Sequence, residues 1–206
     1  MADVAELVLH HLVIKGFATP GALGMATGVD VDGVEAALRA FERDGWVAYL
    51  DGRLQGWRPT PLGREVHRGL VVGSLAPVDA SVRAWYDRFS ELNAELKQLC
   101  TDWQLRATAG KPPVPNDHTD PAYDAGVIDR LRALHRQADA ECTAVERSFP
   151  RAARYRARLS AALAAVEAGD RDRFTKPMHE SYHDVWMELH QDLLISLGRE
   201  RTAADA

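Results

Sequence analysis

The chain has 206 residues, of which 46% are hydrophobic and 27% are charged, and its formal net charge is −5. This is the composition of an ordinary globular protein, and the acidic balance excludes nucleic-acid binding that rests on overall charge alone. Because neither a signal peptide nor a membrane span is visible, and the two cysteines lack metal-binding spacing, we expect a cytoplasmic protein with free thiols and no membrane partner.

The first third of the chain is predicted to form helices and one β-hairpin. Thr19, which precedes a proline, and Asp30 are typical N-cap residues of helices. Asp51-Gly52 between two extended runs predicts a type I′ hairpin turn. The expected elements are helices over residues 4–16, 21–27 and 31–44, a hairpin over 46–58 and a helix over 62–72. This is the element order of a winged helix-turn-helix domain, which we expect over residues 1–73.

Two segments of this domain resemble the MarR-type regulators of bacteria. Residues 42–47 are Glu-Arg-Asp-Gly-Trp-Val, and residues 58–64 are Arg-Pro-Thr-Pro-Leu-Gly-Arg. In that family a Gly-hydrophobic-Val strand follows the third helix, and the hairpin returns into a Leu-Thr-x-x-Gly-Arg turn. The resemblance covers about residues 4–70. It implies a winged helix that binds DNA in a transcriptional regulator, which we expect to be a homodimer.

Four arginines are the candidate DNA contacts of this domain. Residues 31–44 are the recognition helix by position and carry Arg39 and Arg43, while the hairpin supplies Arg53 and Arg58. Binding to DNA requires such cations near the phosphates. The same helix and its cap are also rich in carboxylates: Asp30, Asp32, Glu35, Glu42 and Asp44. Because winged helices also bind proteins, a protein-interaction module without DNA binding is an alternative.

The remainder of the chain is predicted to be an antiparallel helical bundle over residues 78–200. Apolar spacing predicts helices over residues 79–106, 123–147, 150–168 and 178–197, with a short helical piece at 171–176. Residues 108–122 contain four prolines and are expected to lack regular structure. The predicted fold class is therefore mainly α: a winged helix-turn-helix domain with a small β-hairpin, followed by an antiparallel helical bundle.

The last predicted helix, residues 178–197, carries a stripe of histidines. At ~100° per residue, His179, His183 and His190 fall within a ~40° arc that also contains apolar side chains. His135 lies on the inner face of its own predicted helix. Imidazoles that converge in a bundle can bind a divalent metal such as zinc. We therefore take these four histidines as candidate metal ligands.

Residues 165–170, followed by a helix with His183, are similar to the closing part of the FCD effector domains of GntR-type regulators. Those domains are helical bundles with a His-rich metal centre, so the resemblance implies an effector domain. Two alternatives stay open. The histidines could instead be neutral groups of a polar core layer, bonded to carboxylates, Tyr182 or backbone carbonyls. Residues 179–183 also match H-E-x-x-H, the pattern of metal-dependent hydrolases.

A second candidate ligand site is the loop Asn-Asp-His-Thr-Asp at residues 116–120. Asp117, His118 and Asp120 could contact a small-molecule effector, with Trp186 as an aromatic contact. The alternatives are turn and N-cap chemistry for the loop, and a core position for Trp186. The sequence therefore predicts a DNA-binding transcriptional regulator rather than an enzyme, with a bundle that senses a small ligand or a metal.

Overall fold

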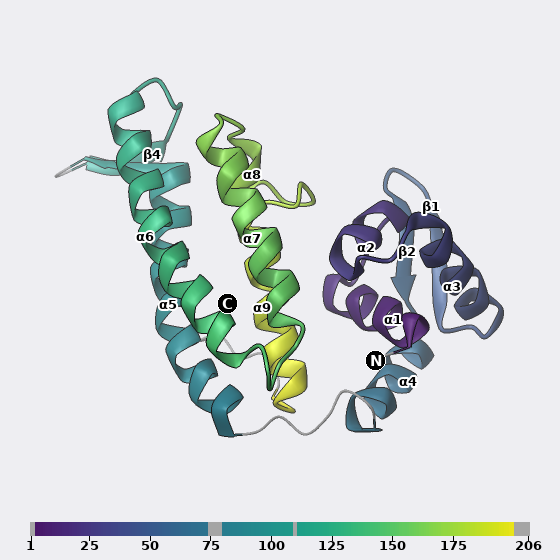
Figure 1. Ribbon diagram of the computed structural model, residues 1–206. Coiled ribbons are helices and arrows are strands. Elements are labelled where there is room, and N and C mark those ends of the chain that lie inside the picture. Colours follow the sequence, from purple (N-terminus) through teal and green to yellow (C-terminus); the bar gives the residue numbers. More distant parts are fainter. Residues whose placement is uncertain (1–2, 74–79, 109–110, 200–206) are drawn as a thin grey trace. The chain divides into compact units, whose positions relative to one another are not determined.

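The structure is a computed structural model that describes residues 3–73, 80–108 and 111–199. It confirms the predicted fold class: the chain is mainly α-helical, with a small antiparallel β-hairpin and a helical bundle (Figure 1). The chain divides into two compact units. The first unit contains Met1–Pro77 and His190–Ala206, and the second contains Val78–Leu189. No helix in the described ranges is long and apolar enough to cross a membrane.

The first unit has the predicted element order. Its elements are α1 (Val4–Lys15), α2 (Pro20–Thr27), α3 (Val31–Arg43), β1 (Val47–Asp51), β2 (Gln55–Pro59) and α4 (Pro61–Gly73). The predicted caps form as expected: Thr19 Oγ1 accepts a hydrogen bond from Ala22 N, and Asp30 Oδ1 accepts one from Gly33 N at 2.7 Å. Local capping chemistry therefore sets where α2 and α3 begin.

The hairpin of the first unit is attached to the helices through Trp57. Trp57 is buried, and its backbone exchanges two hydrogen bonds with Ala18, at 2.9 and 2.8 Å. The apolar side of α3 packs into the same core through Val34, Leu38 and Phe41. Because this side of α3 is buried, the opposite side of the helix faces solvent.

The return from the hairpin into α4 depends on a close backbone approach at Gly63. Thr60 Oγ1 donates a hydrogen bond to Gly45 O at 2.7 Å, and Thr60 N donates to Trp46 O at 2.9 Å. A Cβ atom on Gly63 would lie 2.0 Å from Trp46 O. The glycine of the Thr-Pro-Leu-Gly turn is thus needed because no side chain fits there.

The second unit is a bundle with aromatic inner faces. Its elements are α5 (Ala80–Gln104), β3 (Leu105–Thr108), β4 (Lys111–Pro115), α6 (Pro121–Val145), α7 (Ala152–Glu167), α8 (Asp172–Thr175) and the first part of α9 (Tyr182–Ser196). Helix α6 packs against both α5 and α7 (Figure 1). The buried Trp186 of α9 stacks on Phe89 of α5 at a ring distance of 4.7 Å, and Trp186 Nε1 donates to Asn93 Oδ1 at 3.0 Å.

The prediction that residues 108–122 lack regular structure is wrong at its beginning, where β4 pairs antiparallel with β3. Asn116 N donates to Gln104 O at 2.8 Å, just beyond the paired residues. In an antiparallel ladder the N–H groups of alternate residues point away from the partner strand. Pro115, which is opposite Leu105, occupies such a position, so its missing N–H group removes no bond to β3, and the ladder is irregular between Arg106 and Thr108.

The last helix begins at Tyr182 rather than at residue 178. Met178 and Glu180 have left-handed backbone conformations, with φ of 62° and 51°. The Glu180 carboxylate is held by the buried Arg158 of α7, with 2.8 Å between Arg158 Nη2 and Glu180 Oε2. This long-range ion pair draws the segment away from a helical path, and a wheel of the local sequence does not show it.

A capping box marks the true start of α9. Asp184 N donates to Ser181 Oγ at 3.1 Å, and the Asp184 carboxylate accepts from Ser181 N at 3.3 Å. The same carboxylate accepts from His179 N at 3.0 Å. His179 therefore lies before the helix, and the predicted stripe loses its first member.

Candidate functional site

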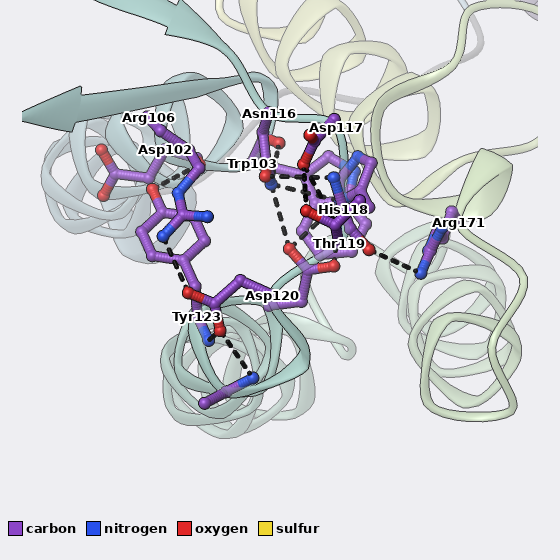
Figure 2. A network of polar contacts seen from close by, with 12 residues as sticks. Asp102, Trp103, Arg106, Asn116, Asp117, His118, Thr119, Asp120, Tyr123 and Arg171 are labelled. Carbon is purple, nitrogen blue, oxygen red and sulfur yellow. Dashed lines mark hydrogen bonds and ion pairs between the residues drawn. The ribbon is translucent and has the colours of Figure 1, made fainter.

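A network of polar contacts surrounds the loop between β4 and α6 in the second unit (Figure 2). Its centre is Asp124, a buried carboxylate on the first turn of α6. This carboxylate accepts hydrogen bonds from Asn116 Nδ2 at 3.0 Å and from His118 Nδ1 at 3.0 Å. Asn116 Nδ2 also donates to Trp103 O at 3.1 Å, and Asn116 Oδ1 accepts from His118 N at 3.2 Å. The loop is thus tied to both α5 and α6.

These contacts determine which nitrogen of His118 carries the hydrogen. The two hydrogens of Asn116 Nδ2 are used by Trp103 O and Asp124 Oδ1. The hydrogen between His118 and Asp124 must therefore come from the imidazole ring, which places it on Nδ1. Nε2 of the neutral ring then carries the lone pair, and it makes no hydrogen bond to the residues that the structure describes.

The His118 ring is held rigidly. It lies 4.4 Å from the Trp103 ring, centroid to centroid, and Trp103 itself contacts Phe174 of α8 at 4.8 Å. The His118 backbone has a left-handed φ of 57°, and its carbonyl accepts a hydrogen bond from Arg171 Nη2 at 3.2 Å (Figure 2). A strained residue held by this many contacts is typical of a position with a defined task.

The two other candidates of the loop have structural contacts. Asp117 Oδ1 accepts from Thr119 Oγ1 at 2.8 Å and from Thr119 N at 3.1 Å, and these bonds lower the pKa of Asp117. Asp120 is the N-cap of α6, where the hydrogen bond from Tyr123 N and then the contact with Arg106 lower the pKa of Asp120. The contacts of Asp117 are those of a turn and the contacts of Asp120 are those of an N-cap, which is the alternative to a ligand site at these two residues.

Sequence reasoning named His118 but missed its partner. Asp124 lies three residues before the buried Val127 and seven before the buried Leu131. An aspartate on the apolar stripe of a helix needs a hydrogen-bond donor. That spacing is the signal that points to Asp124.

His135 is bonded to polar side chains of the bundle, as expected for the alternative in which the histidines belong to a polar core layer. The Tyr182 hydroxyl lies 3.2 Å from His135 Nδ1, and Ser160 Oγ lies 3.2 Å from His135 Nε2. Burial raises the pKa of Tyr182, so its hydroxyl stays neutral and donates to Nδ1. Nε2 then carries the ring hydrogen and donates to Ser160. Burial also lowers the pKa of His135, which favours this neutral form.

The other predicted ligands are not brought together with His135 as a metal centre. His179 is exposed, and its Nδ1 lies 2.9 Å from Pro177 O. His183 is half-buried on α9, and His190 is buried and belongs to the first unit. Within residues 3–73, 80–108 and 111–199, no three His, Cys, Asp or Glu side chains are placed so that they could hold a metal. Trp186, proposed as a ligand contact, is a fully buried core residue.

The four candidate DNA-contacting arginines are all exposed in the first unit. Arg39 and Arg43 lie on α3, Arg53 lies in the turn between β1 and β2, and Arg58 lies on β2. Arg39 Nη1 is 3.2 Å from Glu42 Oε2, and the Arg39 guanidinium lies 5.2 Å from the centre of the Trp57 ring. Helix and hairpin therefore both present cations, and one of these cations already has an acidic partner.

Three buried polar side chains in the first unit, which the sequence did not single out, form a chain of hydrogen bonds. His10 Nδ1 of α1 lies 2.8 Å from His67 Nε2 of α4, and His10 Nε2 lies 3.0 Å from Asp192 Oδ1. All three side chains are buried. Since Asp192 accepts from His10, residues near the end of α9 are attached to the first unit.

Comparisons of the chain with protein-family models, with curated proteins and with solved structures found no match.

Proposed function

We propose that the chain is a DNA-binding transcriptional regulator whose first unit is a winged helix-turn-helix domain. In this proposal α3 is the recognition helix, and the β1–β2 hairpin is the wing. The observation that carries the proposal is the placement of exposed arginines on both elements, Arg39 and Arg43 on α3 and Arg53 and Arg58 on the hairpin. Winged helices contact DNA with these two elements, and arginines supply the phosphate contacts.

The distribution of charge on α3 suggests how this contact is made. The exposed Asp32 and Glu35 lie in the first half of the helix, whereas its second half carries two arginines and a single carboxylate, that of Glu42. Carboxylates beside phosphates are unfavourable, so the second half of α3 and the hairpin would carry the contact. Binding of this kind depends strongly on salt.

The second unit would sense a small ligand in the cytoplasm, and the protein would act as a homodimer. His118 supports the sensing role because Asp124 orients its ring and leaves the Nε2 lone pair without a hydrogen bond in the described part of the chain. A ligand that offers an N–H or O–H donor to this nitrogen fits that chemistry.

Fluorescence anisotropy with labelled duplexes from the protein's own upstream region tests the proposal. Between 50 and 200 mM salt, log K should fall linearly with log salt concentration. Arg43→Ala and Arg53→Ala should each reduce the slope by about 0.9, the value for one phosphate contact. Arg136→Ala, an exposed arginine of α6, removes the same charge from the second unit and should leave the slope unchanged. No binding at 50 mM salt, or an equal effect of Arg136→Ala, would contradict the proposal.

A second candidate function is protein docking by the first unit. The side chains at the beginning of α3 favour this function. In helix-turn-helix complexes this part of the helix contacts bases. Exposed apolar side chains, Met25 at 53% and Val31 at 46%, lie in the same part of the chain as Asp32 and Glu35. Apolar groups flanked by carboxylates suit a basic protein surface better than phosphates. Salt-insensitive anisotropy across all duplexes, including those of unrelated sequence, would favour this function over DNA binding.

A further inference from the structure

Arg39 lies at the junction of α3 and the hairpin. Its guanidinium lies over the Trp57 ring at 5.2 Å, and its Nη1 lies 3.2 Å from Glu42 Oε2, three residues further along the helix. The Arg39 side chain is 63% exposed and that of Glu42 is 40% exposed. This cation of the proposed DNA-binding surface thus has an aromatic support and an acidic partner.

The aromatic support is fixed. Trp57 is buried, its backbone is bonded in both directions to Ala18, and it pairs with Tyr49 across the hairpin. A guanidinium above an aromatic face is attracted to it and loses conformational freedom. Trp57 therefore holds Arg39 beside the hairpin even when its acidic partner is absent.

The acidic partner is held weakly. An exposed i,i+3 ion pair is screened by salt and contributes little to stability. A phosphate oxygen, which also binds arginine through charge-assisted hydrogen bonds, can take the place of the carboxylate. However, Glu42 then remains close to that phosphate and repels it.

We infer that Glu42 is a positioning residue that restrains Arg39 and lowers the affinity of the first unit for DNA. Its carboxylate occupies the guanidinium in the free protein and opposes the phosphate in the complex. The inference rests on the proposed DNA-binding function, and it assigns Glu42 a regulatory effect on the affinity of that surface.

Glu42→Gln tests the inference because it keeps the size of the side chain and removes its charge. With the labelled duplexes above, the variant should bind more tightly at 50 mM salt. Its salt slope should be steeper by about 0.9, which corresponds to about a 3.5-fold larger loss of affinity between 50 and 200 mM. Glu91→Gln, an exposed glutamate of α5, makes the same change in net charge within the second unit and is the matched control.

The double variant Arg39→Ala/Glu42→Gln shows whether Glu42 acts through Arg39. In the Arg39→Ala background, Glu42→Gln should steepen the slope by much less than about 0.9, because only the direct repulsion between the carboxylate and the phosphate is left to remove. An unchanged slope for Glu42→Gln alone, or an equal gain for Glu91→Gln, would overturn the inference while wild-type binding still supports the proposed function. Absence of wild-type binding at 50 mM salt would instead overturn the proposed function, and the inference with it.

Discussion

Replacement of Asp124 by alanine should destabilise the second unit and change the tautomer of His118. The substitution leaves two donors of the network, Asn116 Nδ2 and His118 Nδ1, without their shared acceptor. Each buried donor that loses its partner costs about 1–3 kcal/mol. Because His118 is half-buried and keeps some contact with water, we expect the two donors together to lower the free energy of unfolding by about 2–4 kcal/mol, the lower part of the range for two buried groups.

Native-state hydrogen exchange of the α5 and α6 amides measures this loss without assuming that both units unfold together. The expected loss corresponds to exchange that is about 30- to 900-fold faster. Nitrogen-15 shifts of the imidazole should show the hydrogen of neutral His118 on Nδ1 in the wild type. Asp129→Ala changes an exposed carboxylate of the same helix, and should cost less than about 1 kcal/mol. An Nε2–H tautomer in the wild type, or less than about threefold faster exchange in Asp124→Ala, would refute the reasoning.

Two other predictions concern the fold. Gly63→Ala should destabilise the first unit by about 1–3 kcal/mol, because its Cβ would collide with Trp46 O, whereas Gly69→Ala, with nothing within 4 Å, should stabilise α4 by about 0.5–1 kcal/mol. Thermal denaturation compares the two variants, and equal shifts would contradict the close approach at Gly63. Burial lowers the pKa of His135 below 6.5, so the unfolded chain binds its proton first as the pH falls. The stabilisation from neutral His135 should therefore be present above pH 6.5 and decrease as the pH falls below it. Urea midpoints measured from pH 7 to 5 should fall less steeply for His135→Gln than for the wild type. Identical pH dependences of the two proteins would contradict the predicted loss of stability.

The parts of the structure that local chemistry determines could be predicted from the sequence. Thr19 and Asp30 cap their helices through backbone N–H groups three residues away, and the two extended runs pair as a hairpin. The order of elements in the first unit follows from such signals. For the same reason the position of the candidate arginines on α3 and the hairpin could be predicted. The predicted type I′ turn at Asp51-Gly52 is wrong, because Asp51 pairs with Gln55 as a strand residue and Gly52 lacks the positive φ that this turn requires.

The errors arise where distant residues decide the local conformation. The predicted histidine stripe assumed a helix from residue 178, whereas the ion pair of Glu180 with Arg158 and the left-handed backbone at Met178 delay its start. His118 could be named as a candidate, but its orientation depends on Asp124 and on the Trp103 carbonyl, which only the packed bundle brings to it.

The attachment of Asp192 to His10 has a consequence for how the protein folds during synthesis. The first unit is discontinuous in sequence, because residues 78–189 come between its two parts. At the usual 5–20 residues per second, a ribosome needs roughly 6–22 s to make the intervening segment. During this time the carboxylate that accepts from His10 is not yet part of the chain. The first unit can therefore be complete only after the second unit has been synthesised, and a fragment cut at residue 77 would lack the acceptor of the buried His10 ring.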